Sequence, residues 1–134
     1  MAGETSDYDY VTQAELENFM GGVTFANIDA EYDEAMTAMI ITSAEEMVHS
    51  YIGVSGTAVG TVTDSIKLST KVIAADLMQN IMFHKGQVGD KDVYKELRTE
   101  VIKELLAGDS DVGVDTIPMG GAERYYTAAY RGFY

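Results

Sequence analysis

The sequence predicts an all-α protein: a small four-helix bundle, made of one short helix and three longer ones, with an extended C-terminal arm. Apolar residues recur at helical spacing in three long segments, and capping residues and glycines delimit these segments. No series of segments shows the alternation typical of strands. At 134 residues, of which 46% are hydrophobic, the chain has the size and composition of one globular domain with a modest core.

The chain divides into three parts. Residues 1–10 are polar, acidic and without periodicity, which predicts a flexible N-terminal arm. Residues 11–108 carry all the helical patterns, and we expect them to form the domain. In residues 109–134, glycines, aspartates and Pro118 replace periodicity, so we expect an extended tail.

The first helix is predicted over residues 13–20. Thr12 and Glu15 have the spacing of a capping box, in which the threonine hydroxyl and the glutamate carboxylate each accept a backbone N–H of the other residue. The pair Gly21-Gly22 is expected to end this helix.

The second helix is predicted from a cap at Asp29 to about Ile52, ended by Gly53. Its apolar face is broad, which indicates contacts on more than one side. Core filling is the plain explanation for its methionines, because methionine adapts to irregular gaps. The face consists of a main stripe and a second row: Tyr32, Met36, Met39, Ile40, Ser43, Met47 and Tyr51, then Ile41, Ala44 and Val48.

The third and fourth helices follow a small-residue connection over residues 53–60. The third is predicted from a cap at Asp64 or Ser65 to about Lys85, and apolar residues on two of its sides predict that it is the central, most buried helix. The fourth is predicted to open at Asp90 or Asp92 and to run through Ala107.

Charge is distributed unevenly along the chain. The net charge is −13, and the stretch from Met1 to Ile66 holds 12 acidic residues and no lysine or arginine. Stable DNA binding needs clustered basic residues, so this half argues against a DNA-binding protein. An acidic solubility face, a surface that repels DNA and a salt-adapted source all remain compatible with it. No apolar run of membrane-spanning length and no basic leader with an apolar stretch occurs, so we expect neither a membrane protein nor a secreted one.

Candidate chemistry is sparse. Glu46 and His49 have the Glu-x-x-His spacing of helical metal ligands, but a carboxylate-bridged site needs a second such pair and two further glutamates. A histidine at the surface or in an interface is the plainer reading of His49. The glycines of residues 53–60 lack the lysine of a phosphate-binding loop, and the chain has no cysteine for thiolate chemistry. We therefore expect no catalytic residues, no cofactor and no metal.

The C-terminal tail is rich in the residue types that anchor protein interfaces, aromatic residues and arginine. An extended segment of this kind docks along a groove or a sheet edge of a partner, although folding back over its own bundle is the alternative. The candidate docking residues are Arg124, Tyr125, Tyr126, Tyr130, Arg131, Phe133 and Tyr134.

The capping-box run VTQAEL (11–16), a long helix that ends in Tyr51-Ile52-Gly53, a loop and a helix that opens with DSIKL (64–68) together resemble the head–tail connector (adaptor) proteins of long-tailed viruses. In that family a short Thr-x-x-Glu-Leu helix precedes a long helix that ends in an aromatic residue and a glycine. A loop then leads to a third helix, usually introduced by proline, and to a fourth; no proline precedes Ile66 here. The resemblance covers residues 11–107 and lies in VTQAELENFM (11–20), DEAM (33–36), SAEEMVHSYIG (43–53) and DSIKL (64–68).

The resemblance implies a virion protein, assembled in the host cytoplasm, that forms a dodecameric ring beneath the portal protein. Such a ring extends the DNA channel, with DNA only as passing cargo, and offers a surface to a tail or stopper protein. By the same analogy the C-terminal arm reaches the portal. The second and third helices would supply packing between subunits, and the candidate residues for it are Tyr32, Met36, Met39, Met47 and Tyr51.

Two other functions are compatible with the sequence. One is another interaction module of the packaging machinery, such as a small terminase subunit, which would need a basic helix–turn–helix surface. The absence of lysine and arginine before Lys67 argues against it. The other is a helical metal-dependent enzyme that uses Glu46 and His49.

Overall fold

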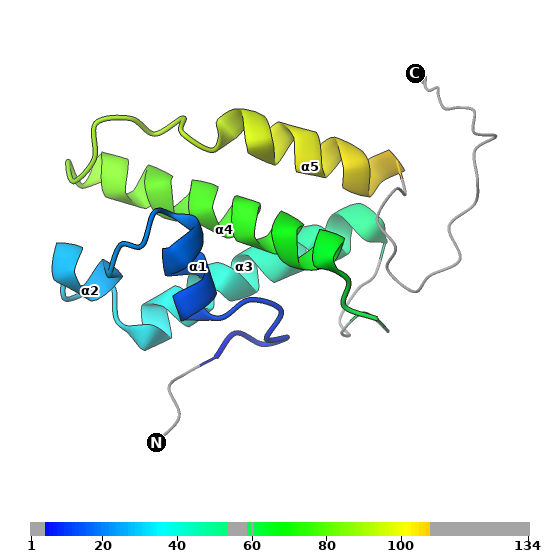
Figure 1. Cartoon of the computed structure of the whole chain (residues 1–134), viewed down its shortest axis with the longest axis horizontal. Helices are drawn as coiled ribbons and strands as arrows, with labels where there is room; N and C mark the ends of the chain where they lie inside the picture. Colours follow the sequence, from blue (N-terminus) through cyan, green and yellow to red (C-terminus); the bar gives the residue numbers. More distant parts are fainter. Residues whose placement is uncertain (1–4, 54–58, 60, 108–134) are drawn as a thin grey trace.

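The computed structural model describes residues 5–53, 59 and 61–107. Within these residues the chain forms five helices and no strand (Figure 1). This confirms the predicted all-α bundle, because four of the helices, α1, α3, α4 and α5, correspond to the four expected from the sequence. The helices are α1 (Gln13–Phe19), α2 (Phe25–Ile28), α3 (Glu34–Ile52), α4 (Asp64–His84) and α5 (Lys95–Ala107).

The first helix begins as predicted and ends one residue before the predicted end, at Phe19. Thr12 and Glu15 form the full capping box, in which the Thr12 hydroxyl accepts the Glu15 N–H and the Glu15 carboxylate accepts the Thr12 N–H. After α1 the backbone turns through Gly21 and Gly22, which both have positive φ. The single turn of α2 was not predicted, because four residues are too few to show a period.

The long helix α3 starts later than predicted. Asp33, not Asp29, is its N-cap, and the Asp33 carboxylate accepts the Met36 N–H at 2.9 Å. Asp29 instead accepts the Glu31 N–H and helps to form the turn between α2 and α3. The predicted stop is confirmed: Gly53 has a φ of 81°, a left-handed conformation that glycine adopts at low cost.

Helix α4 is the central helix, as expected. It packs against α1, α3 and α5, and eleven of its residues are buried. Its N-cap is Thr63, whose hydroxyl accepts the Ile66 N–H, one residue before the earlier of the two predicted caps. Figure 1 shows α4 running between α5 on one side and α1 and α3 on the other.

Helix α5 begins at Lys95, so neither Asp90 nor Asp92 opens it as predicted. The Asp90 carboxylate accepts the Asp92 N–H at 2.8 Å, and the Asp90 carbonyl oxygen accepts the Gln79 side-chain amide at 2.7 Å. These bonds fasten residues 90–92 to α4 as a turn, which delays the start of the helix.

One hydrophobic core joins all five helices and the segment before α1. It includes side chains from α1, α2, α3, α4 and α5, and burial of this apolar surface is the main stabilising contribution. The largest fully buried side chains are Tyr10, Val11, Leu16, Phe25, Tyr32, Ile41, Glu45, Val48, Ile66, Ile73, Met78 and Leu105.

The segment before α1 differs from the flexible arm predicted over residues 1–10. Residues 5–10 lie against α3, and Ser6 and Tyr10 are buried. The prediction is wrong for these residues because it weighed only their polar character, whereas their backbone N–H groups find buried acceptors on α3. Residues 1–4 and the predicted tail, residues 109–134, lie outside the described part of the chain.

None of the helices described here is both long enough and apolar enough to cross a membrane.

Candidate interaction site

The residues predicted to pack between subunits do not share one surface. Met39 is exposed over 70% of its side chain, whereas Met36, Met47 and Tyr51 are half-buried at the edge of the core. Met47 also faces α5, because its Sδ lies 3.6 Å from an Arg98 guanidinium nitrogen. Met39 is therefore the one member of the set that presents most of its surface to solvent.

Tyr32 corrects the prediction. It precedes α3 instead of lying on it, and its side chain is 0% exposed. Its hydroxyl donates to the side-chain oxygen of Gln87, so both the ring and the polar end are used inside the same subunit. Tyr32 is a core residue and has no surface to offer to a neighbour.

A single exposed stripe runs along α3. Five exposed residues follow one another at spacings of three or four, which places them on one side of the helix. Met39 is the one large apolar side chain of the stripe, and small residues flank it. We call this stripe the outer face of α3; it consists of Ala35, Met39, Ser43, Glu46 and Ser50.

The other exposed large apolar side chains are spread over several elements. Single exposed apolar side chains are normal on soluble domains and do not define a site by themselves. They are Ile28 at the end of α2, Val62 before α4, Leu68 on α4, Val93 before α5, and Leu97 and Leu106 on α5.

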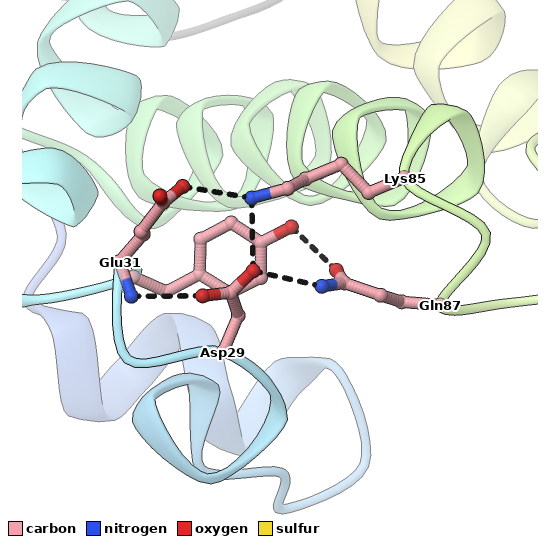
Figure 2. Close-up of polar contacts among 5 residues, drawn as sticks. Asp29, Glu31, Lys85 and Gln87 are labelled. Atoms are coloured by element: carbon pink, nitrogen blue, oxygen red, sulfur yellow. Dashed lines mark hydrogen bonds and ion pairs between the residues drawn. The ribbon is translucent and has the colours of Figure 1, made fainter.

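A polar cluster ties the turn before α3 to the end of α4 (Figure 2). The Lys85 Nζ lies 2.8 Å from an Asp29 carboxylate oxygen and 2.9 Å from a Glu31 carboxylate oxygen, and Gln87 donates to Asp29 at 3.0 Å. The Lys85 ammonium lowers the pKa of Asp29 to about 2. Lys85 also lies 5.0 Å from the centre of the Tyr32 ring. With two carboxylates and a ring around it, Lys85 acts as a structural cation.

A second polar cluster is buried between α3 and the segment before α1. Glu45 is 0% exposed and accepts three hydrogen bonds, from the Ser6 hydroxyl at 2.6 Å, the Tyr8 N–H at 3.1 Å and the Tyr10 N–H at 2.9 Å. One turn later, the His49 Nε2 lies 2.7 Å from the Tyr10 hydroxyl oxygen. Burial raises the pKa of Glu45 and lowers the pKa of His49.

Sequence reasoning missed this cluster, although a signal was present. Glu45 lies four residues after Ile41 and three before Val48, so a carboxylate stands in the middle of the apolar row. The prediction paired His49 with Glu46, but Glu46 is exposed and His49 is buried. The surface or interface reading of His49 is thus wrong for the single chain, since the Tyr10 hydroxyl and the Tyr8 ring cover the imidazole.

The described surface is hollowed beside α5 and beside the segment before α1. An open depression of about 320 Å³ follows one side of α5 and is lined by Lys95, Glu96, Leu97, Thr99 and Glu100. A cavity of about 50 Å³ lies where residues 5–13 meet Ala38 and Ile41 of α3. Neither hollow gathers a base, a nucleophile and an oxyanion donor. Within the described ranges, no group of three or more histidine, aspartate or glutamate side chains is placed to hold a metal.

The predicted docking residues of the tail, Arg124 to Tyr134, lie outside the described part of the chain. Comparison with protein-family models, curated proteins and solved structures found no match.

Proposed function

We propose that this chain is a structural, non-catalytic ring subunit at the head–tail joint of a tailed virus. It docks under the portal protein, extends the DNA channel and joins the capsid to the tail or to a stopper protein. The observation that supports this best is the order of the helices. A short capping-box helix, a long helix that ends in Tyr51-Ile52-Gly53, a central helix and a last helix occur in the order that the resemblance to the connector proteins leads one to expect, with the single turn of α2 between the first two.

The outer face of α3 is the surface we assign to packing between subunits. Met39 projects an unbranched, adaptable apolar side chain from a face of small residues, which lets a neighbouring helix approach closely. Met36, Met47 and Tyr51 border the core and support this face from the sides, whereas buried Tyr32 is no longer part of the contact.

The acidic half of the chain fits a channel through which DNA passes. Its carboxylates repel phosphates, so DNA slides without being held. We assign the binding of the portal protein to the aromatic and arginine residues of the tail, from Arg124 to Tyr134.

Substitution of Met39 tests the role of the outer face. Met39→Asp places a charge at the centre of the proposed contact, whereas the exposure of Met39 predicts little effect on the fold of the single chain. When the gene is disrupted and the Met39→Asp protein is supplied in its place, we expect at least about ten times fewer infectious particles than with the wild-type protein.

Leu106→Asp is the matched control, because Leu106 is an equally apolar, 64% exposed residue on α5. Circular dichroism of both purified variants checks that the helices are retained. If a folded Met39→Asp protein fully restored infectious particles, the outer face of α3 would not be a contact between subunits.

A further inference from the structure

The segment formed by residues 6–11, which we call the strap, is held by the buried side chains of Tyr10 and Val11 and by hydrogen bonds to side chains of α3. It has no helix or strand of its own, and its backbone N–H groups donate to side chains of α3. Asp7 donates to the Thr42 hydroxyl at 2.9 Å, while Tyr8 and Tyr10 donate to the Glu45 carboxylate. The polar part of this attachment therefore depends on a few α3 side chains instead of a backbone ladder, and it adds to the burial of Tyr10 and Val11.

His49 provides the second anchor of the strap, and its protonation state is set by the hydrogen bonds around it. The Tyr10 hydroxyl oxygen accepts the Val59 N–H at 2.8 Å, so its hydrogen is free to point to His49 Nε2, 2.7 Å away. Nε2 then accepts, which requires a neutral imidazole with its proton on Nδ1. Among the described residues the structure records no other acceptor for the Tyr10 hydroxyl hydrogen.

A proton on Nε2 conflicts with this arrangement. The imidazolium has two N–H donors and no acceptor, so the Tyr10 hydroxyl hydrogen would have to turn away from Nε2, 2.7 Å from its oxygen, and would lose its acceptor. The charge would also be buried against the Tyr8 ring, whose centre lies 4.4 Å from that of the imidazole. A buried charge and an unsatisfied hydroxyl both cost free energy, and an open strap would relieve both.

We propose that the strap is an acid-sensitive latch, in which protonation of His49 frees Tyr10 and lets residues 6–11 leave α3 while the helices stay packed. The open latch exposes Glu45 and His49, together with Ala38 and Ile41, which line the cavity beside the strap. The latch is a property of the fold and does not depend on the assembly role proposed above.

The charges around His49 fix the direction of the response. Tyr8 and Tyr10 face the His49 imidazole from the strap, and Glu46 lies on the same helix as His49. On the side of α4 and α5, Asp76 and Arg98 form an ion pair, and Arg98 contacts α3 at the Met47 sulfur. Burial outweighs the attraction of Glu46 and lowers the pKa of His49 below 6.5. The open strap thus binds the proton more tightly, so opening becomes more favourable as the pH falls below 6.5.

Glu45 acts in the opposite sense, so the test must separate the two groups. Burial, helped by the charge of Asp7, raises the pKa of Glu45, and proton uptake on its carboxyl favours the closed strap. His49→Gln leaves Glu45 unchanged and offers an amide oxygen to the Tyr10 hydroxyl, but it does not titrate. The ratio of opening constants between wild type and His49→Gln therefore isolates the histidine.

The experiment measures amide hydrogen exchange of Tyr8 and Tyr10 in the full chain by NMR from pH 7.5 to 5, corrected for intrinsic exchange rates. We expect the ratio of opening constants, wild type over His49→Gln, to rise by up to about tenfold per pH unit below 6.5. Exchange at Val72 to Ala75, inside α4, should show no such rise. The matched control His84→Gln, which removes an exposed histidine of α4, should follow wild type.

A flat ratio overturns the proposal, and so does a parallel loss of protection in α4, which would mean global unfolding. If His49→Gln does not fold, the pKa of His49 measured by NMR in the wild-type chain decides. A value below 6.5 supports the latch, and a value of 6.5 or above overturns it.

Discussion

At the scale of single residues, the decisive feature is a carboxylate that the helix pattern places in the core. Glu45 occupies an apolar position of α3 and is retained there because three donors, one hydroxyl and two backbone N–H groups, satisfy it. The sequence shows the position but not the donors, since these come from a segment more than thirty residues away. For the same reason the packing of residues 5–10 on α3, the role of Tyr32 and the burial of His49 were not predictable from periodicity.

Glu45→Ala tests this account of the buried carboxylate. The substitution leaves the Ser6 hydroxyl and the Tyr8 and Tyr10 N–H groups without their acceptor, and each unsatisfied buried group costs about 1–3 kcal/mol. We expect the free energy of unfolding, measured by urea denaturation, to fall by at least about 2 kcal/mol.

The control is the neighbouring Glu46→Ala. Glu46 is exposed on the outer face of α3, so its loss should change stability by no more than about 0.5 kcal/mol. Equal effects of the two substitutions would show that Glu45 does not anchor the segment before α1.

At the scale of elements, the sequence predicted the helices better than their starts. Three helix boundaries carry local chemistry that can be read directly from the sequence: the capping box at Thr12, the glycines after α1 and the left-handed Gly53. The starts of α3 and α5 were misplaced because several aspartates compete as caps. Asp29 and Asp90 bind turn N–H groups instead, and the bonds from Lys85 and Gln79 that hold these turns are long-range.

Gly53→Ala tests the end of α3. A residue with a side chain at a φ of 81° is strained, and no atom of the described residues obstructs the added carbon, so the expected cost is that of the backbone. We expect thermal denaturation to report a loss of about 1 kcal/mol.

Gly89→Ala is the matched control, because the space around Gly89 is also open and its backbone lies outside the left-handed region. It should be neutral or slightly stabilising through the unfolded chain. If the Gly53→Ala protein were as stable as the control, the left-handed conformation of the C-cap Gly53 would not contribute to the stability of the chain.

At the scale of the whole molecule, the bundle combines a self-sufficient core with an unbalanced charge. The core takes side chains from all five described helices, so the described part of the chain forms one packed unit. The first half, up to Ile66, has no lysine or arginine, and in the second half Lys85 and Arg98 form ion pairs with Asp29, Glu31 and Asp76. The outer face of α3 and the tail are the surfaces that we assign to partners.

The measurement that tests the central proposal most directly is electron microscopy of particles produced in the source virus after disruption of this gene. A subunit of the head–tail joint predicts heads that are emptied or leak DNA, beside detached and otherwise complete tails. Joined particles of normal appearance would contradict the proposal and leave the bundle without its assigned partners.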